Sequence, residues 1–357
     1  MSRSLTCLFS TSKRNVGRLA WCKRRDNFQF IYTSKKYSTS HSSVDLPIII
    51  PTKGVPIHLY TNEIEPDVMT QLQVLAESPL PTGHIAVMPD VHLGEGVAIG
   101  TVFASEKYIC PNAVGVDIGC GVAAVPIEGL YLHDLSHANR LEIQRRLKER
   151  IPTGFEQRRS MWEGAKNILD DISNELKPSS YLEDQLHLPR VTDQLGTLGG
   201  GNHFLEVVHN ASDGQVWAML HSGSRNVGNR VARHYDQAAQ HYLQTEEGID
   251  IKSLKGLHYM PIDSTQGFDY IQDMVWCQKY AFHNRRIMKQ VMLEIIEQVT
   301  GRVPDMTKAI NVHHNFCACE TCNGRKLWIT RKGATSAKMG QFGLIPGSMG
   351  TVSLNLR

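Results

Sequence analysis

Residues 115–121 read Gly-Val-Asp-Ile-Gly-Cys-Gly, and a β-prone apolar segment, residues 122–126, follows them directly. The glycines interrupt this turn, so neither Asp117 nor Cys120 is committed to one face of a helix or strand. Both side chains can therefore converge on one ion, and a thiolate beside a carboxylate indicates a mixed metal site. The stretch predicts a core in which strands alternate with ligand-bearing glycine loops.

Further loops combine glycine with residues able to hold a metal or a phosphate. They are Pro89-Asp-Val-His-Leu-Gly-Glu-Gly96, Gly196-Thr-Leu-Gly-Gly-Gly-Asn-His203, His221-Ser-Gly-Ser-Arg225 and Ile345-Pro-Gly-Ser-Met-Gly350. Glycine by itself is weak evidence, because turns use it to reach positive φ. The chemistry is indicated by the acids, histidines and basic residues that the glycines flank.

Outward from these loops, the chain shows two kinds of hydrophobic pattern. Apolar residues recur at intervals of three and four in residues 137–176, 229–247 and 267–300, which predicts helices. Short β-prone segments bounded by Gly, Pro or Asn predict strands at 85–88, 98–104, 122–126, 204–208, 215–220 and 326–331. No Pro/Ser-rich linker interrupts residues 45–357. We therefore expect one α+β domain there, with helices inserted into a sheet-rich core.

Residues 1–44 differ in composition from the rest of the chain. They hold many Ser and Thr residues, and their Lys and Arg residues face a single acid, Asp26. This leader is basic and lacks the apolar run of a secretory signal, so it predicts an organelle transit peptide, for the mitochondrion or the plastid. A disordered basic tail is the alternative, and a chain without an import signal would be cytoplasmic.

The composition excludes several classes of protein. With 41% hydrophobic residues in a chain of 357, a sizeable core can form, which excludes disorder of the whole chain. No run approaches the roughly 18 apolar residues of a membrane-spanning helix, so we expect a soluble protein with no membrane partner. The net charge of +3 favours local phosphate-binding clusters over a strongly basic surface. No loop continues as Gly-Lys-Ser/Thr, which argues against a P-loop NTPase.

Histidines supply the other candidate metal ligands. His203 and His221 each adjoin a predicted strand and small residues, and His313, His314 and Asn315 follow downstream. One histidine among 16 is usually structural, but an acid, a thiol and several histidines in glycine-lined loops indicate a polynuclear site. Ligand softness alone favours zinc for this mixture, and the spacing does not choose the metal.

Two smaller groups of residues also suggest binding. Cys317, Cys319 and Cys322 form a C-x-C-x-x-C cluster, which is either a zinc site with His313 as fourth ligand or a set of reduced thiols. The eight cysteines as a whole have no regular spacing, which argues against a disulfide framework. Basic side chains near glycine turns suit phosphate binding, and the candidates are Arg225, Arg331 and Lys332.

Taken together, these segments resemble one known family, the RtcB-type RNA-splicing ligases. The motifs that carry the resemblance are Pro89-Asp-Val-His92, Val116-Asp-Ile-Gly-Cys-Gly121, Gly200-Gly-Asn-His-Phe-Leu-Glu206, His221-Ser-Gly-Ser-Arg225, His313-His-Asn315, Arg331-Lys-Gly-Ala334 and Pro346-Gly-Ser-Met349. They occur in the family's order across residues 45–357, which we therefore expect to form one RtcB-like domain.

The resemblance implies a ligase that depends on GTP and manganese and joins an RNA 3′-phosphate or 2′,3′-cyclic phosphate end to a 5′-hydroxyl end, as in tRNA splicing and RNA repair. It implies two manganese ions bridged by Cys120, and the remaining metal ligands would be Asp117, His203, His221 and His314. His314 is preferred to His313 because it adjoins Asn315, as in the family motif.

The same resemblance implies which residues bind the other substrates. Those that match the family's guanine-nucleotide contacts are Asn202, His203, Phe204, Leu205, Glu206, His314, Asn315, Pro346, Gly347, Ser348, Met349 and Ser353. Arg225 matches a residue that holds the RNA phosphate. The expected partners are therefore RNA with broken ends and, by analogy with the family, an archease-type activator.

The family's nucleophile is a histidine that becomes guanylylated, in a Ser-His-Gly-Ala-Gly-type segment downstream of the Pro-Gly-Ser-Met turn. The seven residues after Gly350 contain no histidine, so we expect the domain to be C-terminally incomplete and the nucleophile to lie beyond Arg357. An incomplete gene model is favoured over a splice form or a relative that has lost ligation. Two other functions stay open, a metal-dependent cyclic-phosphate hydrolase and a non-catalytic RNA- or nucleotide-binding protein.

Overall fold

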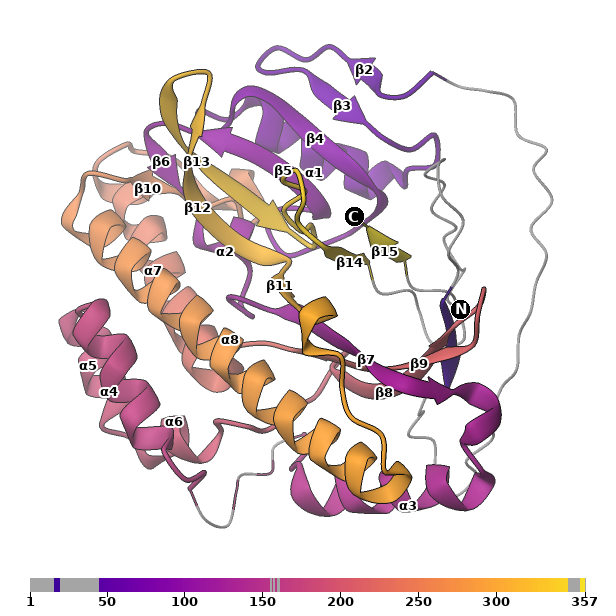
Figure 1. Cartoon of the computed structure of the whole chain (residues 1–357). Helices are drawn as coiled ribbons and strands as arrows, with labels where there is room; N and C mark the ends of the chain where they lie inside the picture. Colours follow the sequence, from indigo (N-terminus) through magenta and orange to yellow (C-terminus); the bar gives the residue numbers. More distant parts are fainter. Residues whose placement is uncertain are drawn as a thin grey trace.

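Two larger β-sheets organise the described part of the chain (Figure 1). One of the passages between them takes a single residue, His314, which separates the strand Ile310–His313 from the strand Asn315–Cys322. The computed structural model describes residues 16–19, residues 45–345 except 155, 157, 159 and 160, and residues 354–356. Most of the basic leader is outside this range, so the transit peptide stays a prediction.

The first sheet is antiparallel, with the strand order β1-β8-β9-β7-β11. Its strands are β1 (Val16–Leu19), β7 (Gly121–Tyr131), β8 (Phe204–Asn210), β9 (Gln215–Ser222) and β11 (Ile310–His313). On one face of β7, Ala123 and Val125 pack with side chains of the long helix α8 (Thr265–Thr300). On the other face, Val122 and Ala124 pack with Leu344. Burial of both faces explains why this strand is continuously apolar.

The second sheet has the strand order β12-β13-β5-β4-β3-β2. Its strands are β2 (Ile48–Ile50), β3 (Ile57–Leu59), β4 (Thr82–His92), β5 (Ile99–Ser105), β12 (Asn315–Cys322) and β13 (Arg325–Lys332). Neighbouring strands are antiparallel except for the parallel pair of β3 and β4. A parallel pair needs a crossover, which helix α1 (Pro66–Glu77) supplies. Leu72 and Leu75 of α1 are buried in one cluster with Ile85 of β4.

Helices cover the first sheet on one side. Helix α8 packs against β7, β9 and β11 and also contacts the helices α3, α4 and α7 (Figure 1). The remaining helices are α2 (Pro111–Val114), α3 (His137–Arg150), α4 (Ala165–Glu175), α5 (Ser180–Leu186), α6 (Pro189–Asp193) and α7 (Arg225–Thr245). Short elements complete the description: β6 (Tyr108–Ile109), β10 (Met260–Pro261), β14 (Gly343–Ile345), β15 (Leu354–Leu356), η1 (Leu132–Asp134), η2 (Ile251–Leu254) and η3 (Met306–Lys308).

The α+β class is confirmed, and each of the six predicted strands overlaps an observed one. The helices predicted at 229–247 and 267–300 correspond to α7 and α8. The helical pattern of residues 137–176 corresponds to two helices, α3 and α4, and the break between Arg150 and Ala165 was not predicted. Pro152 disfavours a helical conformation at Ile151, and Gly154 and Gly164 adopt positive φ of 63° and 78°.

Across the described residues, no helix combines the length and the apolar character needed to cross a membrane.

Candidate metal centre

The loop between α2 and β7 places Asp117 and Cys120 at the junction of the two sheets. The amide of Cys120 donates to the carbonyl of Asp117 at 3.0 Å, which closes the turn. Gly119, at φ 72°, lies against α8 so closely that a Cβ there would be 2.8 Å from the Cα of Gln278. A glycine is therefore required at this position. The amide of Gly119 also donates to the carbonyl of Asn315 at 2.7 Å, which ties the loop to the start of β12.

Three histidines reach the same place from other segments. His221 is near the end of β9, where it is paired in register with Val122 of β7 and Phe204 of β8. His203 directly precedes β8, and His314 separates β11 from β12. The amide of His314 donates to the carbonyl of Cys120 at 2.8 Å. Strand pairing thus brings together residues nearly 200 positions apart in the sequence.

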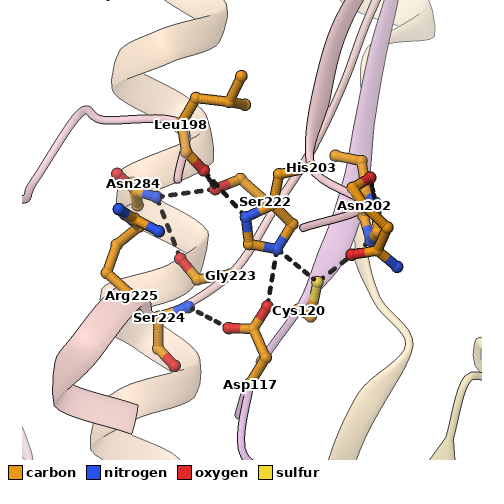
Figure 2. Close-up of polar contacts among 12 residues, drawn as sticks. Asp117, Cys120, Leu198, Asn202, His203, Ser222, Gly223, Ser224, Arg225 and Asn284 are labelled. Carbon is orange, nitrogen blue, oxygen red and sulfur yellow. Dashed lines mark hydrogen bonds and ion pairs between the residues drawn. The ribbon is translucent and has the colours of Figure 1, made fainter. Parts of the chain in front are cut away.

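The five side chains form two triplets that share one thiol. In one triplet are Asp117, Cys120 and His203, and in the other are Cys120, His221 and His314; within each, the ligand atoms lie within 4.8 Å of one another. The Cys120 Sγ is 3.5 Å from His203 Nε2 and 3.1 Å from His221 Nε2. His203 Nε2 is 2.8 Å from Asp117 Oδ2 (Figure 2), and His221 Nε2 is 3.1 Å from His314 Nε2.

In His203 and His221, the hydrogen bond of Nδ1 determines whether Nε2 can act as a metal ligand. His203 Nδ1 is 3.0 Å from the carbonyl of Leu198, and His221 Nδ1 is 3.1 Å from the carbonyl of Asn202. A carbonyl only accepts, so Nδ1 donates, and in the neutral form of each ring the lone pair of Nε2 faces the centre. These lone pairs meet a carboxylate oxygen, a sulfur and another imidazole nitrogen. Such a convergence of acceptors is what a metal cation satisfies, and a backbone partner on the second ring nitrogen is usual for metal-binding histidines.

Burial favours the uncharged form of His221, His314 and Cys120. It lowers the pKa of His221 to about 4, assisted by the neighbouring His203, and it lowers the pKa of His314 well below its ordinary value. Both rings are therefore neutral at pH 7. Burial, together with the charge of Asp117, raises the pKa of the Cys120 thiol well above its ordinary value. Binding of a cation by Cys120 would then require loss of the thiol proton.

His313 points away from the two triplets. Its Nδ1 is 2.8 Å from the carbonyl of Gly119 and 3.1 Å from a guanidinium nitrogen of Arg285. Burial lowers the pKa of His313 to about 3, with a further contribution from Arg285, so this ring is also neutral. Of the two adjacent histidines, the structure therefore brings His314 into the centre.

The cysteine cluster does not form a second metal site among the residues that the structure describes. The three residues lie on the extended strand β12, where Cys317 and Cys319 share one face and Cys322 lies on the other. Cys317 is buried and its sulfur accepts a hydrogen bond from Thr330 at 3.3 Å, whereas Cys319 is exposed. Among the described residues the three cysteines are free thiols and form no donor group with His313, so the zinc alternative gains no support here.

The candidate nucleotide contacts that the structure describes lie on β8, at the start of β12 and in the residues that directly precede these strands. Phe204 packs on His221, with ring centroids 5.4 Å apart, and Glu206 is buried in β8. The backbone carbonyl of Asn202 accepts a hydrogen bond from the ring of His221. The side-chain oxygen of Asn315 accepts a hydrogen bond from the amide of Gly333 at 2.8 Å. Leu205 also lies on β8. The other candidates, Pro346, Gly347, Ser348, Met349 and Ser353, fall outside the described residues.

Arg225 remains the best-placed candidate for a phosphate. It stands at the start of α7 with φ 61°, and its guanidinium donates to Thr197 Oγ1 and to the carbonyl of Gly154 (Figure 2 shows its position beside the Asp117 loop). Burial lowers the pKa of Arg225 without a hydrogen-bonded carboxylate among its described contacts.

The other two basic candidates are engaged elsewhere. Arg331 forms an ion pair with Glu320 at 2.6 Å, and the ammonium of buried Lys332 donates to the carbonyls of Glu95 and Asn112 at 2.7 and 2.8 Å. Neither side chain is therefore available to a phosphate in this arrangement.

Two residues of α8 that support the centre were not among the sequence predictions. Asn284 binds the loop before His203, through the amides of Gly196 and Thr197, and also donates to the carbonyl of Gly223 (Figure 2). Arg285 is fully buried beside the loop of Cys120. Polar residues that interrupt the apolar face of a long helix were the available signal.

Comparisons with known proteins agree with this architecture. The family model "tRNA-splicing ligase RtcB" matches residues 71–357. The RNA-splicing ligase RtcB of Escherichia coli K12 is 38% identical over 327 residues, which cover 87% of this chain and 77% of the relative. The tRNA-splicing ligase RtcB of Archaeoglobus fulgidus is 30% identical over 372 residues, which cover 85% of this chain and 76% of the relative.

The α+β fold, the donor cluster and these matches together define an enzyme of the ligase class. Within that class, the chain belongs to the RtcB family of tRNA-splicing ligases.

Proposed function

We propose that this chain is an RNA ligase that uses GTP and manganese to join a 3′-phosphate or 2′,3′-cyclic phosphate end to a 5′-hydroxyl end. The observation that carries the proposal is the convergence of lone pairs on two positions that share the Cys120 sulfur. Two ions held a few ångströms apart suit phosphoryl transfer, in which an attacking and a leaving oxygen must both be stabilised. The names of the relatives support RNA, and tRNA in particular, as the substrate.

The donor set allows manganese but does not select it. Three imidazoles, one carboxylate and one thiol also suit zinc, and the preference for manganese comes from the family resemblance. When bound, the ions would polarise a phosphoryl group and offset its negative charge. The chain itself orients the ligands. The carbonyls of Leu198 and Asn202 fix the rings of His203 and His221. The amide of Ser224 donates to Asp117 Oδ1 at 3.2 Å.

The RNA phosphate and the guanine nucleotide would bind on the two sides of this centre. Arg225 supplies a planar cation that matches a phosphate, and its position beside Asp117 is compatible with an RNA end next to the ions. Phe204, Glu206 and Asn315 lie beside His221 and His314, which supports a nucleotide there. The ligation test uses the protein encoded by the transcript, sequenced through its 3′ end.

The test compares the encoded wild-type protein with its Cys120→Ala variant. RNA with a 3′-phosphate is mixed with RNA bearing a 5′-hydroxyl, GTP and Mn²⁺, and the joined product is separated by gel electrophoresis. We expect joining, and transfer of label from GTP to the protein, that disappear in the variant and in EDTA. Cyclic-phosphate opening with metal but without GTP would favour the hydrolase instead. RNA binding with no turnover and no effect of Cys120→Ala would favour the binding protein.

Two further proposals rest on the sequence and the family resemblance alone. Residues 1–44 would direct import into the mitochondrion or the plastid, which a fluorescent fusion of this segment tests: retention in the cytosol would contradict import.

An archease-type activator would speed repeated turnover, and an unchanged rate after adding such a protein would contradict that expectation.

A further inference from the structure

Arg285 is a fully buried cation whose hydrogen-bond partners are all uncharged. Its Nε donates to Asn311 Oδ1 at 2.7 Å, and its Nη1 donates to the carbonyls of Gly119 and Ser222 at 2.7 and 2.9 Å. Its Nη2 is 3.1 Å from His313 Nδ1. Because His313 Nδ1 also faces the Gly119 carbonyl, it accepts from Arg285 in one tautomer and donates to Gly119 in the other.

The charge persists despite the burial. Burial lowers the pKa of Arg285 only to about 10, so the guanidinium is protonated at neutral pH. A buried charge without a carboxylate is costly in free energy, and a hydrophobic side chain would fill the space at lower cost. Stability alone therefore does not account for an arginine here.

Three of the four residues that Arg285 contacts, all but Asn311, directly adjoin a candidate metal ligand in the sequence. Gly119 precedes Cys120, Ser222 follows His221, and His313 precedes His314. One rigid guanidinium thus connects the loop before β7, the end of β9 and the end of β11. These three segments carry the donor atoms of the triplet Cys120, His221 and His314.

The neighbouring residue on the helix supports the remaining ligand segment. Asn284 holds the amides of Gly196 and Thr197, in the loop that leads to His203, and the carbonyl of Gly223, whose Cα faces Asp117. One turn of α8 therefore contacts every segment that contributes a donor. Helix α8 has 36 residues and packs against three strands of the first sheet, so it can hold the side chains of Asn284 and Arg285 in fixed positions.

We infer that Arg285 is a positioning residue that sets the separation of Cys120, His221 and His314, and through it the affinity and geometry of the metal centre. The inference rests on the proposed metal-dependent function and adds a residue that touches neither metal nor substrate. A planar fork with five donors is required, because the three segments approach it from different directions.

The experiment uses Arg285→Lys and Arg285→Met in the full chain, with Asp273→Asn as the matched control. Asp273 is also fully buried on α8, but it binds Ser179 and Tyr235, away from the ligand segments. Lysine keeps the charge of Arg285 without the fork. For each protein we would measure Mn²⁺ affinity by titration calorimetry, the absorption bands of the Co²⁺-substituted centre, and the unfolding midpoint in EDTA.

We expect both Arg285 variants to bind Mn²⁺ at least about tenfold more weakly, the range usual for residues that orient metal ligands. Their cobalt thiolate bands should shift, because the distance from Cys120 to the histidines changes. Asp273→Asn should lower the unfolding midpoint while leaving the affinity and the cobalt spectrum unchanged. Asn311→Ala, at a half-buried position, frees one donor of Arg285 and should shift the same spectrum slightly, even if the Arg285 variants do not fold.

The outcomes separate this inference from the proposed function. Absence of metal binding by the wild-type protein would contradict the proposed metal centre itself. Wild-type binding with unchanged affinity and spectrum in both Arg285 variants would overturn only the positioning role. Losses of affinity that follow the unfolding midpoint in all variants, Asp273→Asn included, would overturn it as well, because Arg285 would then be merely structural.

Discussion

Gly223 shows at the scale of single residues how tightly the centre is packed. A Cβ at this position would be 2.1 Å from Asp117 Oδ1, although the backbone does not need positive φ there. The side chain that would have to move is a candidate metal ligand. An alanine could therefore be accommodated by the fold but not by the carboxylate in its present position.

Gly223→Ala should weaken Mn²⁺ binding by displacing Asp117, with little change in the unfolding midpoint in EDTA. Titration calorimetry measures the affinity, and a double-mutant cycle identifies the route. In an Asp117→Ala background the same substitution should have no further effect on affinity, because the group it displaces is absent. Equal losses in both backgrounds would contradict a path through Asp117.

Lys332 is buried, and its burial should make the free energy of unfolding depend on pH. Burial lowers its pKa to about 8, from 10.5 in the exposed state. Between these values the unfolded chain binds more protons at this residue than the folded chain, so its contribution to stability rises with pH.

The free energy of unfolding of the wild-type protein, relative to Lys332→Met, should increase by about 1 kcal/mol between pH 7 and pH 9. Denaturant unfolding of both proteins in EDTA at the two pH values measures this difference. The comparison with the variant removes titrations that both proteins share. A constant difference would show that Lys332 keeps its ordinary pKa when folded, and one that falls with pH would show that folding raises its pKa; either would contradict the prediction.

At the scale of elements, helix α8 packs against the first sheet and contacts the loops of the metal centre. It ends at a C-cap formed by Gly301. Gly301 adopts φ 68° after Thr300, and its amide donates to the carbonyl of Glu297 at 2.7 Å. A Cβ at Gly301 would meet nothing within 4 Å, so only the left-handed backbone conformation opposes a side chain.

Gly301→Ala should lower the free energy of unfolding by about 1 kcal/mol, the cost of a left-handed conformation for an L-residue. Gly301→Asn should cost less, since asparagine tolerates this region better. Denaturant unfolding in EDTA measures both. Equal stability of the alanine variant and the wild type would mean that α8 ends differently in solution.

Periodicity identified the elements whose burial is one-sided and long, such as α8 and α7. It failed at residues 151–164, where Pro152 and two positive-φ glycines break an otherwise helical pattern. Strand β12 was missed because its half-buried Phe316 and exposed Cys319 do not alternate cleanly, and its place is fixed by pairing with β13. Local sequence does not encode such long-range pairing.

At the scale of the whole molecule, the candidate site is the junction of two sheets. The glycine loops indicated the donor types, and the family resemblance implied the ligand set. The physical grouping depends on the pairing of β7 with β9 and β11, which decides which atoms meet. The position of Arg285 on an apolar helix face was visible in the sequence, but its role was not, because a helical pattern shows which face is buried and not which carbonyls lie opposite. The choice between His313 and His314 likewise depends on the passage of the chain from β11 to β12.

The most direct test of the metal centre is anomalous diffraction at the manganese absorption edge, from crystals of the full chain grown with Mn²⁺. The account predicts two peaks, one among Asp117, Cys120 and His203 and the other among Cys120, His221 and His314, with His313 remaining beside Arg285. A centre without manganese next to Cys120, or with His313 as a ligand in place of His314, would contradict it.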